Sequence, residues 1–255
     1  MRHFLFFLLA LFLVLSPTRL CAQTVVSIKI DGAINPAAAE FIHNSINHAA
    51  ESDAECIVIQ LNTPGGLLKS TRVIVSDILE SKVPVIVYVS PGGSHAGSAG
   101  VFITLAAHIA AMAPGTNIGA AHPVSMQGEQ DSVMMEKATN DAAAFIRSIA
   151  EKRNRNLKWA EESVRRSLSI TETEALKTKV IDFVAKDIEE LLAKVDSMVV
   201  EVPSGSVVLR TRNATIEQVE MSWSERFLDV LSDPNIAYIF FMLGVYGLLF
   251  ELYNP

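Results

Sequence analysis

The chain is organised around one glycine-rich stretch, Pro91-Gly92-Gly93-Ser94-His95-Ala96-Gly97-Ser98-Ala99-Gly100. An apolar run over residues 83–89 precedes it and predicts a buried β-strand, and an apolar run over residues 101–107 follows it and predicts a buried helix. A strand, a turn and a helix in this order bring the amides of the turn and the helix N-terminus to one point. The stretch alone fits an inert turn of small residues as well as a turn that presents Ser98 as a nucleophile.

Size, composition and charge limit the classes of function. With 255 residues the chain can hold one ordinary domain with attachments, and an apolar fraction of 50% favours a membrane segment. The net charge of −7 excludes nucleic acid as the expected partner, because phosphate binding needs a basic face. Neither Cys21 nor Cys56 belongs to a metal-ligand pattern, and we expect no metal and no cofactor.

The N-terminus has the pattern of a secretory signal peptide over residues 1–22. Arg2 and His3 precede an apolar run over residues 4–15, and a cleavage site after Ala22 is plausible. The run is shorter than the ~20 residues that a bilayer span needs. We therefore expect the rest of the chain to be exported, to a periplasmic or other extracytoplasmic location. A lipid anchor on Cys21 is less favoured, because bulky Arg19 and Leu20 precede it.

Strands and helices are expected to alternate along the next part of the chain. Strands are predicted over 24–30, 56–61, 83–89, 108–112 and 180–184, and helices over 36–50, 67–79, 98–107, 131–153, 157–167 and 188–195, with a short one after Thr171. This alternation predicts an α/β core of parallel strands joined by helices. Binding sites in such sheets form at the carboxyl ends of strands, where the turns 63–66 and 92–100 both fall, so we expect the two turns to make one site.

The last part of the chain is expected to differ from this core. Two short runs within residues 197–211 predict a β-hairpin, and residues 201–233 are interpreted as that hairpin with a connecting helix. Residues 236–250 are almost wholly apolar, but a helix of that length reaches only ~22 Å of the ~30 Å hydrocarbon core. We interpret residues 234–255 as the start of a membrane region that continues further; a buried core helix is the alternative.

A nucleophilic Ser98 requires a base. The order Ser-acid-His of α/β-hydrolases is excluded, because no Asp or Glu lies between Ser98 and His122, the last histidine. Two arrangements remain: Ser98 with His122 and a later acid such as Asp182, or Ser98 with Lys137, the first Lys or Arg after it. Lys137 falls at the edge of an apolar helix face, so we expect its amine to be partly desolvated, which would make it a better proton acceptor.

Acyl transfer also requires amide donors for the negative charge that develops on the attacked carbonyl oxygen. Gly65 and Gly66 have no side chains to block their amides, and the amide of Ala99 at the helix N-terminus can join them. We predict that these three residues form an oxyanion hole. A phosphate-binding loop is a weaker interpretation of residues 63–66, because the Lys-Ser/Thr ending of a P-loop is missing.

The sequence resembles the NfeD family of membrane-bound serine proteases, which have a Clp-protease/crotonase-like fold. The resemblance extends over about residues 24–250. Its motifs are Asn62-Thr63-Pro64-Gly65-Gly66, Gly97-Ser98-Ala99-Gly100, Ala113-Pro114-Gly115-Thr116-Asn117-Ile118-Gly119-Ala120, Lys137, and Thr171-Glu172-Thr173-Glu174-Ala175-Leu176 with Val180-Ile181-Asp182. The resemblance implies an α/β fold of repeated ββα units, with residues 23–200 as the Clp-protease-like domain. It further implies a Ser-Lys dyad, matched by Ser98 and Lys137, and a glycine pair matched by Gly65 and Gly66.

The resemblance also implies a function and partners. Such a protein would be a membrane-anchored endopeptidase that cleaves hydrophobic segments of stomatin- or flotillin-like membrane proteins, and it would form homodimers. Clp-type subunits instead use a histidine downstream of the serine, where His122 lies, so His122 is the reserve base. Two alternatives are an acyl-CoA hydratase or isomerase on the crotonase fold, which lacks a glutamate within residues 100–121 here, and a non-catalytic membrane scaffold.

Overall fold

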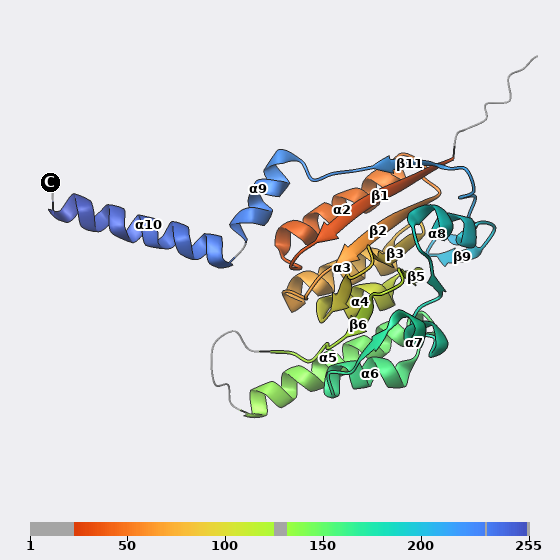
Figure 1. Cartoon of the computed structure of the whole chain (residues 1–255), viewed down its shortest axis with the longest axis horizontal. Helices are drawn as coiled ribbons and strands as arrows, with labels where there is room; N and C mark the ends of the chain where they lie inside the picture. The colour runs from red at the N-terminus through yellow and green to blue at the C-terminus, as the bar shows by residue number, and fades with distance from the viewer. Residues whose placement is uncertain (1–22, 125–131, 233, 254–255) are drawn as a thin grey trace, which may run out of the picture.

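The computed structural model describes residues 23–124, 132–232 and 234–253 (Figure 1). Its centre is a parallel sheet with the strand order β11-β1-β2-β3-β5-β8. The strands are β1 (Thr24–Asp31), β2 (Cys56–Asn62), β3 (Val85–Val89), β5 (Ile109–Met112), β8 (Phe183–Val184) and β11 (Thr215–Gln218). The predicted α/β core of parallel strands is confirmed.

The central strands are buried on both faces, as parallel strands covered by helices must be. In β3, Val85, Val87 and Val89 point into a core on one side of the sheet, whereas Ile86 and Tyr88 point into a second core on the other side. This alternation follows from the two-residue period of a strand. Continuous runs of β-branched residues are therefore the sequence signal of the sheet's centre.

Helices pack on both faces of the sheet. The larger core lies beneath α2 (Pro36–Glu51), α3 (Leu68–Glu80), α4 (Ala99–Ala106), α5 (Ser132–Lys152) and α6 (Leu157–Arg165), and the smaller core beneath α8 (Ile188–Val195). Local chemistry sets the helix starts: the Asn35 side chain accepts a hydrogen bond from the Ala38 amide, with Pro36 in the first turn. The capping pattern predicted at Thr171 is also present, at the start of α7 (Glu172–Lys177).

A second, three-stranded sheet was not predicted. It contains β4 (His95–Gly97), β6 (Asn117–Gly119) and β7 (Ser169–Thr171), with β4 parallel and β7 antiparallel to β6. The glycine-rich stretch is therefore not a turn throughout, because its residues 95–97 form a strand. The strand predicted over 180–184 is shorter than expected, since the amides of Val180 and Ile181 donate to the Ala175 carbonyl and close α7 instead.

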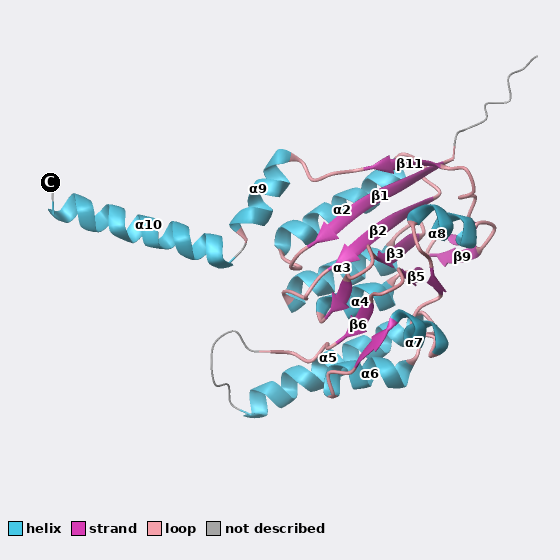
Figure 2. Ribbon diagram, viewed as in Figure 1, coloured by secondary structure: helices cyan, strands magenta, loops and turns pink. Residues whose placement is uncertain are grey.

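The C-terminal part leaves the body of the molecule (Figure 2). The predicted hairpin is present as β9 (Val199–Val202) and β10 (Gly205–Val208), and β11 then returns to pair with β1 in the central sheet. Residues 201–233 thus also contribute a strand to the core, followed by α9 (Trp223–Leu231). Helix α10 (Pro234–Tyr253) contains an 18-residue apolar segment, Ile236–Tyr253, that is long enough to cross a membrane and has no buried residue. The signal peptide predicted for residues 1–22 lies outside the described residues.

Candidate active site

Ser98 lies at the sharp turn between β4 and α4. Its backbone angles, φ 47° and ψ −105°, are rare for a residue with a side chain. Such a conformation costs on the order of 1–3 kcal/mol and is typical of functional sites. It also presents the hydroxyl at the tip of a strand-to-helix turn, as in a nucleophile elbow. Sequence placed Ser98 at a strand-to-helix junction, and the structure shows that the strand is the short β4.

Backbone hydrogen bonds from two sheets hold this turn. The amide of Ser98 donates to the Gly119 carbonyl over 3.1 Å, which ties it to β6. The amide of Gly97 donates to the Thr63 carbonyl over 2.9 Å, and the amide of Thr63 donates to the His95 carbonyl over 2.9 Å. The end of β2 and the glycine-rich stretch are thus paired, so the two turns at the carboxyl ends of strands lie side by side.

The turn is packed too closely for larger residues. A Cβ atom at Gly100 would lie 2.8 Å from the Thr63 Cγ2 and 3.2 Å from the Ala96 Cβ. Glycine at this position lets the first turn of α4 approach the end of β2. The close approach brings the backbone of residues 65 and 66 next to Ser98.

Two of the three predicted oxyanion amides are available. The amides of Gly66 and Ala99 have no hydrogen-bond partner among the described residues, as expected for Ala99 in the first turn of a helix. The amide of Gly65 donates to the Thr63 Oγ1 over 3.1 Å and is therefore already paired, which differs from the prediction. A side chain at residue 66 would collide with the Ile34 carbonyl, so this position requires glycine.

A cavity of ≈ 330 Å³ opens beside Ser98. Apolar side chains from α3, α4, α5 and the segment after β6 form most of its wall. The lining residues are Gly66, Leu67, Leu68, Thr71, Ser98, Ala99, Phe102, Ala121, Pro123, Val124, Met135, Ala138 and Ala142. Ser98 and the two free amides therefore face a space suited to an apolar side chain of a peptide.

Neither candidate base is hydrogen-bonded to Ser98 among the described residues. Lys137 is exposed on α5, while its neighbours Met135 and Ala138 line the cavity. The expected desolvation of Lys137 is thus absent, because the buried face of α5 begins only at Ala142.

His122 is half-buried beside the cavity, since Ala121 and Pro123 belong to the cavity wall. Its Nδ1 lies 2.9 Å from the Val164 carbonyl oxygen. Because a carbonyl only accepts, Nδ1 is the donor in this contact, and in the neutral ring Nε2 is the acceptor.

The acid suggested for a His122 triad lies elsewhere. The Asp182 Oδ2 accepts hydrogen bonds from the Ala110 amide over 2.8 Å and from the Arg155 guanidinium over 3.0 Å. Asp182 therefore stabilises the start of β5, at the end of the sheet opposite the site. The arrangement Ser98-His122-Asp182 is not formed.

Helix α5 is held at the cavity by contacts that sequence reasoning missed. The Arg72 Nη2 of α3 lies 2.6 Å from the Asp141 Oδ2, and its guanidinium lies 4.2 Å from the centre of the Phe145 ring. Phe145 also stacks on Phe102 of α4 with ring centres 5.5 Å apart. These contacts fix α5 one turn after Lys137. An arginine and an acid more than sixty positions apart give no local sequence signal.

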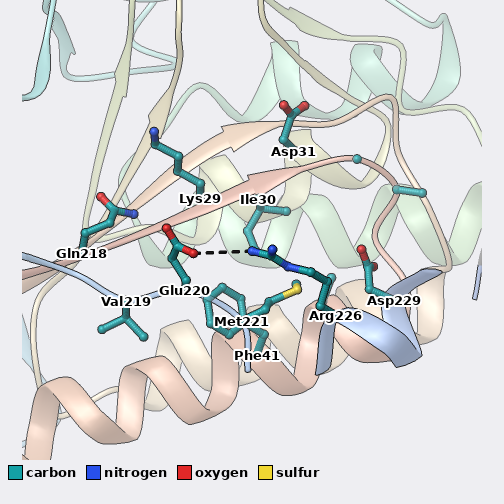
Figure 3. A pocket seen from close by; sticks show the side chains of 13 residues that line it. Lys29, Ile30, Asp31, Phe41, Gln218, Val219, Glu220, Met221, Arg226 and Asp229 are labelled. Atoms are coloured by element: carbon teal, nitrogen blue, oxygen red, sulfur yellow. Dashed lines mark hydrogen bonds and ion pairs between the residues drawn. The ribbon is translucent and has the colours of Figure 1, made fainter. Parts of the chain in front are cut away.

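A second cavity, of ≈ 340 Å³, lies at the carboxyl end of β1 (Figure 3). Charged side chains surround it: Lys29, Asp31, Glu220, Arg226 and Asp229. Among the described residues, its lining contains no serine, cysteine or histidine. It therefore offers no hydroxyl or thiol for acyl transfer, and the cavity beside Ser98 is the candidate active site.

Comparison with known proteins identifies the family of the chain. The family model of the NfeD1b N-terminal domain matches residues 24–219. The membrane-bound protease PH1510 of Pyrococcus horikoshii is 37% identical over 260 residues, which are 100% of this chain and 58% of that protein. The chain thus spans little more than half the length of this relative.

Solved structures of related proteins show the same fold. One of them is the 1510-N membrane-bound stomatin-specific protease of Pyrococcus horikoshii, solved as a lysine-to-alanine variant with a substrate peptide. It is 37% identical to this chain with a TM-score of 0.76, and the match covers 84% of this chain and 100% of that chain. The same protease has also been solved as a serine-to-alanine variant. ClpP1 of Listeria monocytogenes, at 22% identity and a TM-score of 0.51 over 63% of this chain and 91% of that chain, shares the fold alone. The predicted Clp-protease-like fold is confirmed.

Proposed function

The chain belongs to the NfeD1b family, and we propose that it is a membrane-anchored serine endopeptidase. The observation that carries the proposal is the strained Ser98 at the edge of an apolar cavity, next to the unpaired amides of Gly66 and Ala99. This is the arrangement that acyl transfer needs: a nucleophile that lines a cavity, donors for an oxyanion, and a space that orients the substrate.

The reaction follows from this geometry. The Ser98 Oγ attacks the carbonyl carbon of the scissile peptide bond, and its proton passes to the base. The carbonyl oxygen becomes an oxyanion that accepts hydrogen bonds from the Gly66 and Ala99 amides. The base then protonates the leaving amine as the C–N bond breaks, which leaves an acyl ester on Ser98. Water hydrolyses that ester by the same steps and releases the new carboxylate.

We assign the base to Lys137. It is the first cation after Ser98 in the sequence, and it lies on α5 between two residues that line the cavity. To reach Ser98, its side chain has to turn across Ala138. A peptide bound in the cavity would then shield the Lys137 amine from water, and this desolvation favours the neutral amine that can accept the Ser98 proton. The solved lysine-to-alanine and serine-to-alanine variants of the related protease support the pairing of these two residue types.

His122 is the second candidate, and one observation favours it. The contact of its Nδ1 with the Val164 carbonyl fixes the ring with Nε2 as the acceptor, which is the form of histidine that acts as a base. The substitutions described in the Discussion distinguish the two residues.

The substrate we propose is an apolar segment of a stomatin- or flotillin-like membrane protein. The wall of the cavity is mostly aliphatic and aromatic, so it fits Leu, Val or Ala side chains rather than charged ones. The related protease is described as stomatin-specific. We further propose that the protein forms homodimers and that the Ser98 domain lies outside the cytoplasm, as the predicted signal peptide at residues 1–22 indicates.

The two alternatives are less well supported. An acyl-CoA hydratase or isomerase needs carboxyl groups at its site, and none of the described residues that line the Ser98 cavity is Asp or Glu. A scaffold without catalysis has no use for a strained serine beside two unpaired amides.

Product analysis tests the proposal. The full chain in detergent would be incubated with a synthetic peptide rich in Val, Leu and Ala, and the products would be identified by mass spectrometry. We expect defined fragments from the wild type and none from Ser98→Ala. Ser94→Ala, in the same stretch but buried, is the matched control and should retain cleavage. Equal fragment yields from wild type and Ser98→Ala would refute the serine mechanism.

A further inference from the structure

Helix α9 has two chemically different faces. Trp223, Phe227 and Val230 have exposed fractions of 81%, 49% and 49%, and at 3.6 residues per turn they lie within about 60° of one another. The rings of Trp223 and Phe227 are stacked, with centres 5.7 Å apart. Leu228, with an exposed fraction of 55%, lies about 140° around the helix from Trp223 and flanks the polar face. A helix of nine residues thus carries an apolar surface that no described part of the chain covers.

The opposite face of α9 is attached to the body of the molecule. The Asp229 Oδ1 accepts a hydrogen bond from the Asn35 Nδ2 over 2.7 Å, and the Glu225 Oε1 accepts one from the Asn44 Nδ2 over 3.1 Å. Both asparagines belong to α2 or cap it. Two contacts one helical turn apart fix the rotation of α9 about its axis. The apolar face is therefore held outward, away from the protein.

The chain leads directly from this helix into the candidate membrane span. Only residues 232–235 separate the end of α9 from Ile236, where the apolar segment of α10 begins. In the view of Figure 1, α9 runs across the direction of α10, as a helix in the membrane plane would run across a helix that crosses the membrane. Tryptophan and other aromatic side chains are enriched at the depth of the lipid headgroups. An amphipathic helix of this kind binds a lipid surface by burying its apolar face at that depth.

We propose that α9 lies in the headgroup region of the bilayer that α10 enters, with Trp223, Phe227 and Val230 inserted among the lipids. The polar face, through Glu225 and Asp229, carries the Ser98 domain on the water side.

This contact has a consequence for the active site. Asn35, which donates a hydrogen bond to Asp229, directly follows Ile34 in the sequence. The amide of Ile34 donates to the Gly65 carbonyl over 2.8 Å, and its carbonyl accepts from the Leu67 amide over 2.8 Å. The membrane-bound helix is thus joined to the loop that contains Gly66 by one hydrogen bond to Asn35 and by two hydrogen bonds of the adjacent Ile34. The Ser98 cavity is held at a fixed height and orientation above the lipid, where an apolar segment leaving the bilayer can reach it.

The depth of Trp223 can be measured in a protein with one tryptophan. The chain has two, Trp159 and Trp223, so Trp159→Phe leaves only the residue on α9. The full chain would be reconstituted in phosphatidylcholine vesicles whose acyl chains carry bromine either near the headgroup or near the chain end. We expect blue-shifted emission, several-fold stronger quenching by the shallow bromines than by the deep ones, and little quenching by aqueous acrylamide.

Two further variants, built on Trp159→Phe with Trp223→Phe, test the orientation of the helix. Val230→Trp places the tryptophan on the apolar face and should reproduce the quenching of Trp223. Ser224→Trp places it at an exposed position about 120° around the helix from Val230, toward the polar face, where emission should shift to the red and acrylamide should quench it. Equal quenching at both positions would overturn the orientation.

The other outcomes refute the proposal. Quenching of Trp223 by acrylamide but not by brominated lipid would show that α9 stays in water. Protection from both quenchers would show that a second copy or another protein covers the face. The readout does not depend on peptidase activity and should be unchanged in a Ser98→Ala background, so its failure and the failure of the proposed enzyme function are separate.

Discussion

A Cβ atom at Gly65 would lie 2.6 Å from the Cβ of Ser98 and 3.1 Å from its Oγ. The backbone of the β2 turn therefore packs directly on the serine, with no space for a side chain between them. This contact fixes where the hydroxyl stands relative to the Gly66 and Ala99 amides. The position of the nucleophile thus depends on a residue that supplies no functional group.

Gly65→Ala should displace Ser98 and reduce kcat by about 100-fold or more, because a misplacement of ~1 Å is enough for such a loss. Gly32→Ala is the matched control: Gly32 also has a large positive φ, 146° against 129° for Gly65, but no atom lies within 4 Å of its Cβ position. Both variants should lose stability from backbone strain, and only Gly65→Ala should lose activity per folded molecule. Steady-state kinetics corrected for the folded fraction measures this, and an equal loss of kcat in both would contradict it.

Replacing Ser98 by glycine should make the protein inactive but more stable than replacing it by alanine. Both substitutions remove the hydroxyl, and they differ in the Cβ that makes φ 47° unfavourable. We expect Ser98→Gly to exceed Ser98→Ala by about 1 kcal/mol in the free energy of unfolding, from relief of strain. Urea denaturation measures the difference. A more stable alanine variant would show that the turn is not strained.

Substitution of the two candidate bases should give unequal losses. Lys137→Ala and Lys137→Arg should both reduce kcat by roughly 10²–10⁴-fold, because a guanidinium keeps its proton and cannot act as the base. His122→Ala should have a milder effect, and Lys152→Ala, an exposed lysine in the last turn of the same helix, should have none. An inactive His122→Ala together with an active Lys137→Ala would assign the base to His122.

Acid should destabilise the protein through His108. Burial, and secondly the Arg153 guanidinium, lower the pKa of His108 from 6.5 to about 3. Its Nδ1 accepts a hydrogen bond from the Val85 amide, and the Arg153 Nη2 lies 3.2 Å from its Nε2. Both ring nitrogens thus face N–H donors, so a second proton on the ring would point at a donor. The unfolded chain takes up a proton below pH 6.5 and the folded chain does not. The destabilisation caused by His108 is therefore absent at pH 7. The free energy of unfolding falls as the pH drops from 6.5 toward 3.

His108→Asn tests this pH dependence, because an asparagine oxygen can accept from the Val85 amide without titrating. Between pH 7 and pH 5 the wild type should lose on the order of 2 kcal/mol more than the variant in the free energy of unfolding. Urea denaturation at the two pH values provides the comparison. Parallel losses in the two proteins would show that other groups cause the acid sensitivity.

The central sheet could be predicted from sequence because its strands carry their own signal. Strands β2 and β3 contain runs of β-branched residues, and each is followed by a turn with proline and glycine; burial on both faces explains those runs. The second sheet had no such signal, because His95-Ala96-Gly97 and Asn117-Ile118-Gly119 are short and poor in β-forming residues. Their pairing depends on distant partners, which periodicity along the chain does not reveal.

The same distinction applies to the candidate site. Residue order and the needs of acyl transfer made Ser98, Gly66 and Ala99 candidates, and the structure places all three in the lining of one cavity. The pairing of the Gly65 amide with Thr63 could not be foreseen, because it depends on the rotamer of one hydroxyl side chain. The exposure of Lys137 was also missed, since helical periodicity gives the angle of a residue but not whether anything packs against it.

The pairing of β1 with β11 has a consequence for how the chain folds as it is made. Thr24 lies opposite Thr215, so one edge of the first strand acquires its partner only when most of the domain has left the ribosome. Until then this edge presents unpaired backbone groups along an apolar strand, which is a template for association with other chains. Fragments that end before Thr215 should therefore aggregate, and the time needed to synthesise residues 32–218 sets the period during which the nascent protein depends on chaperones.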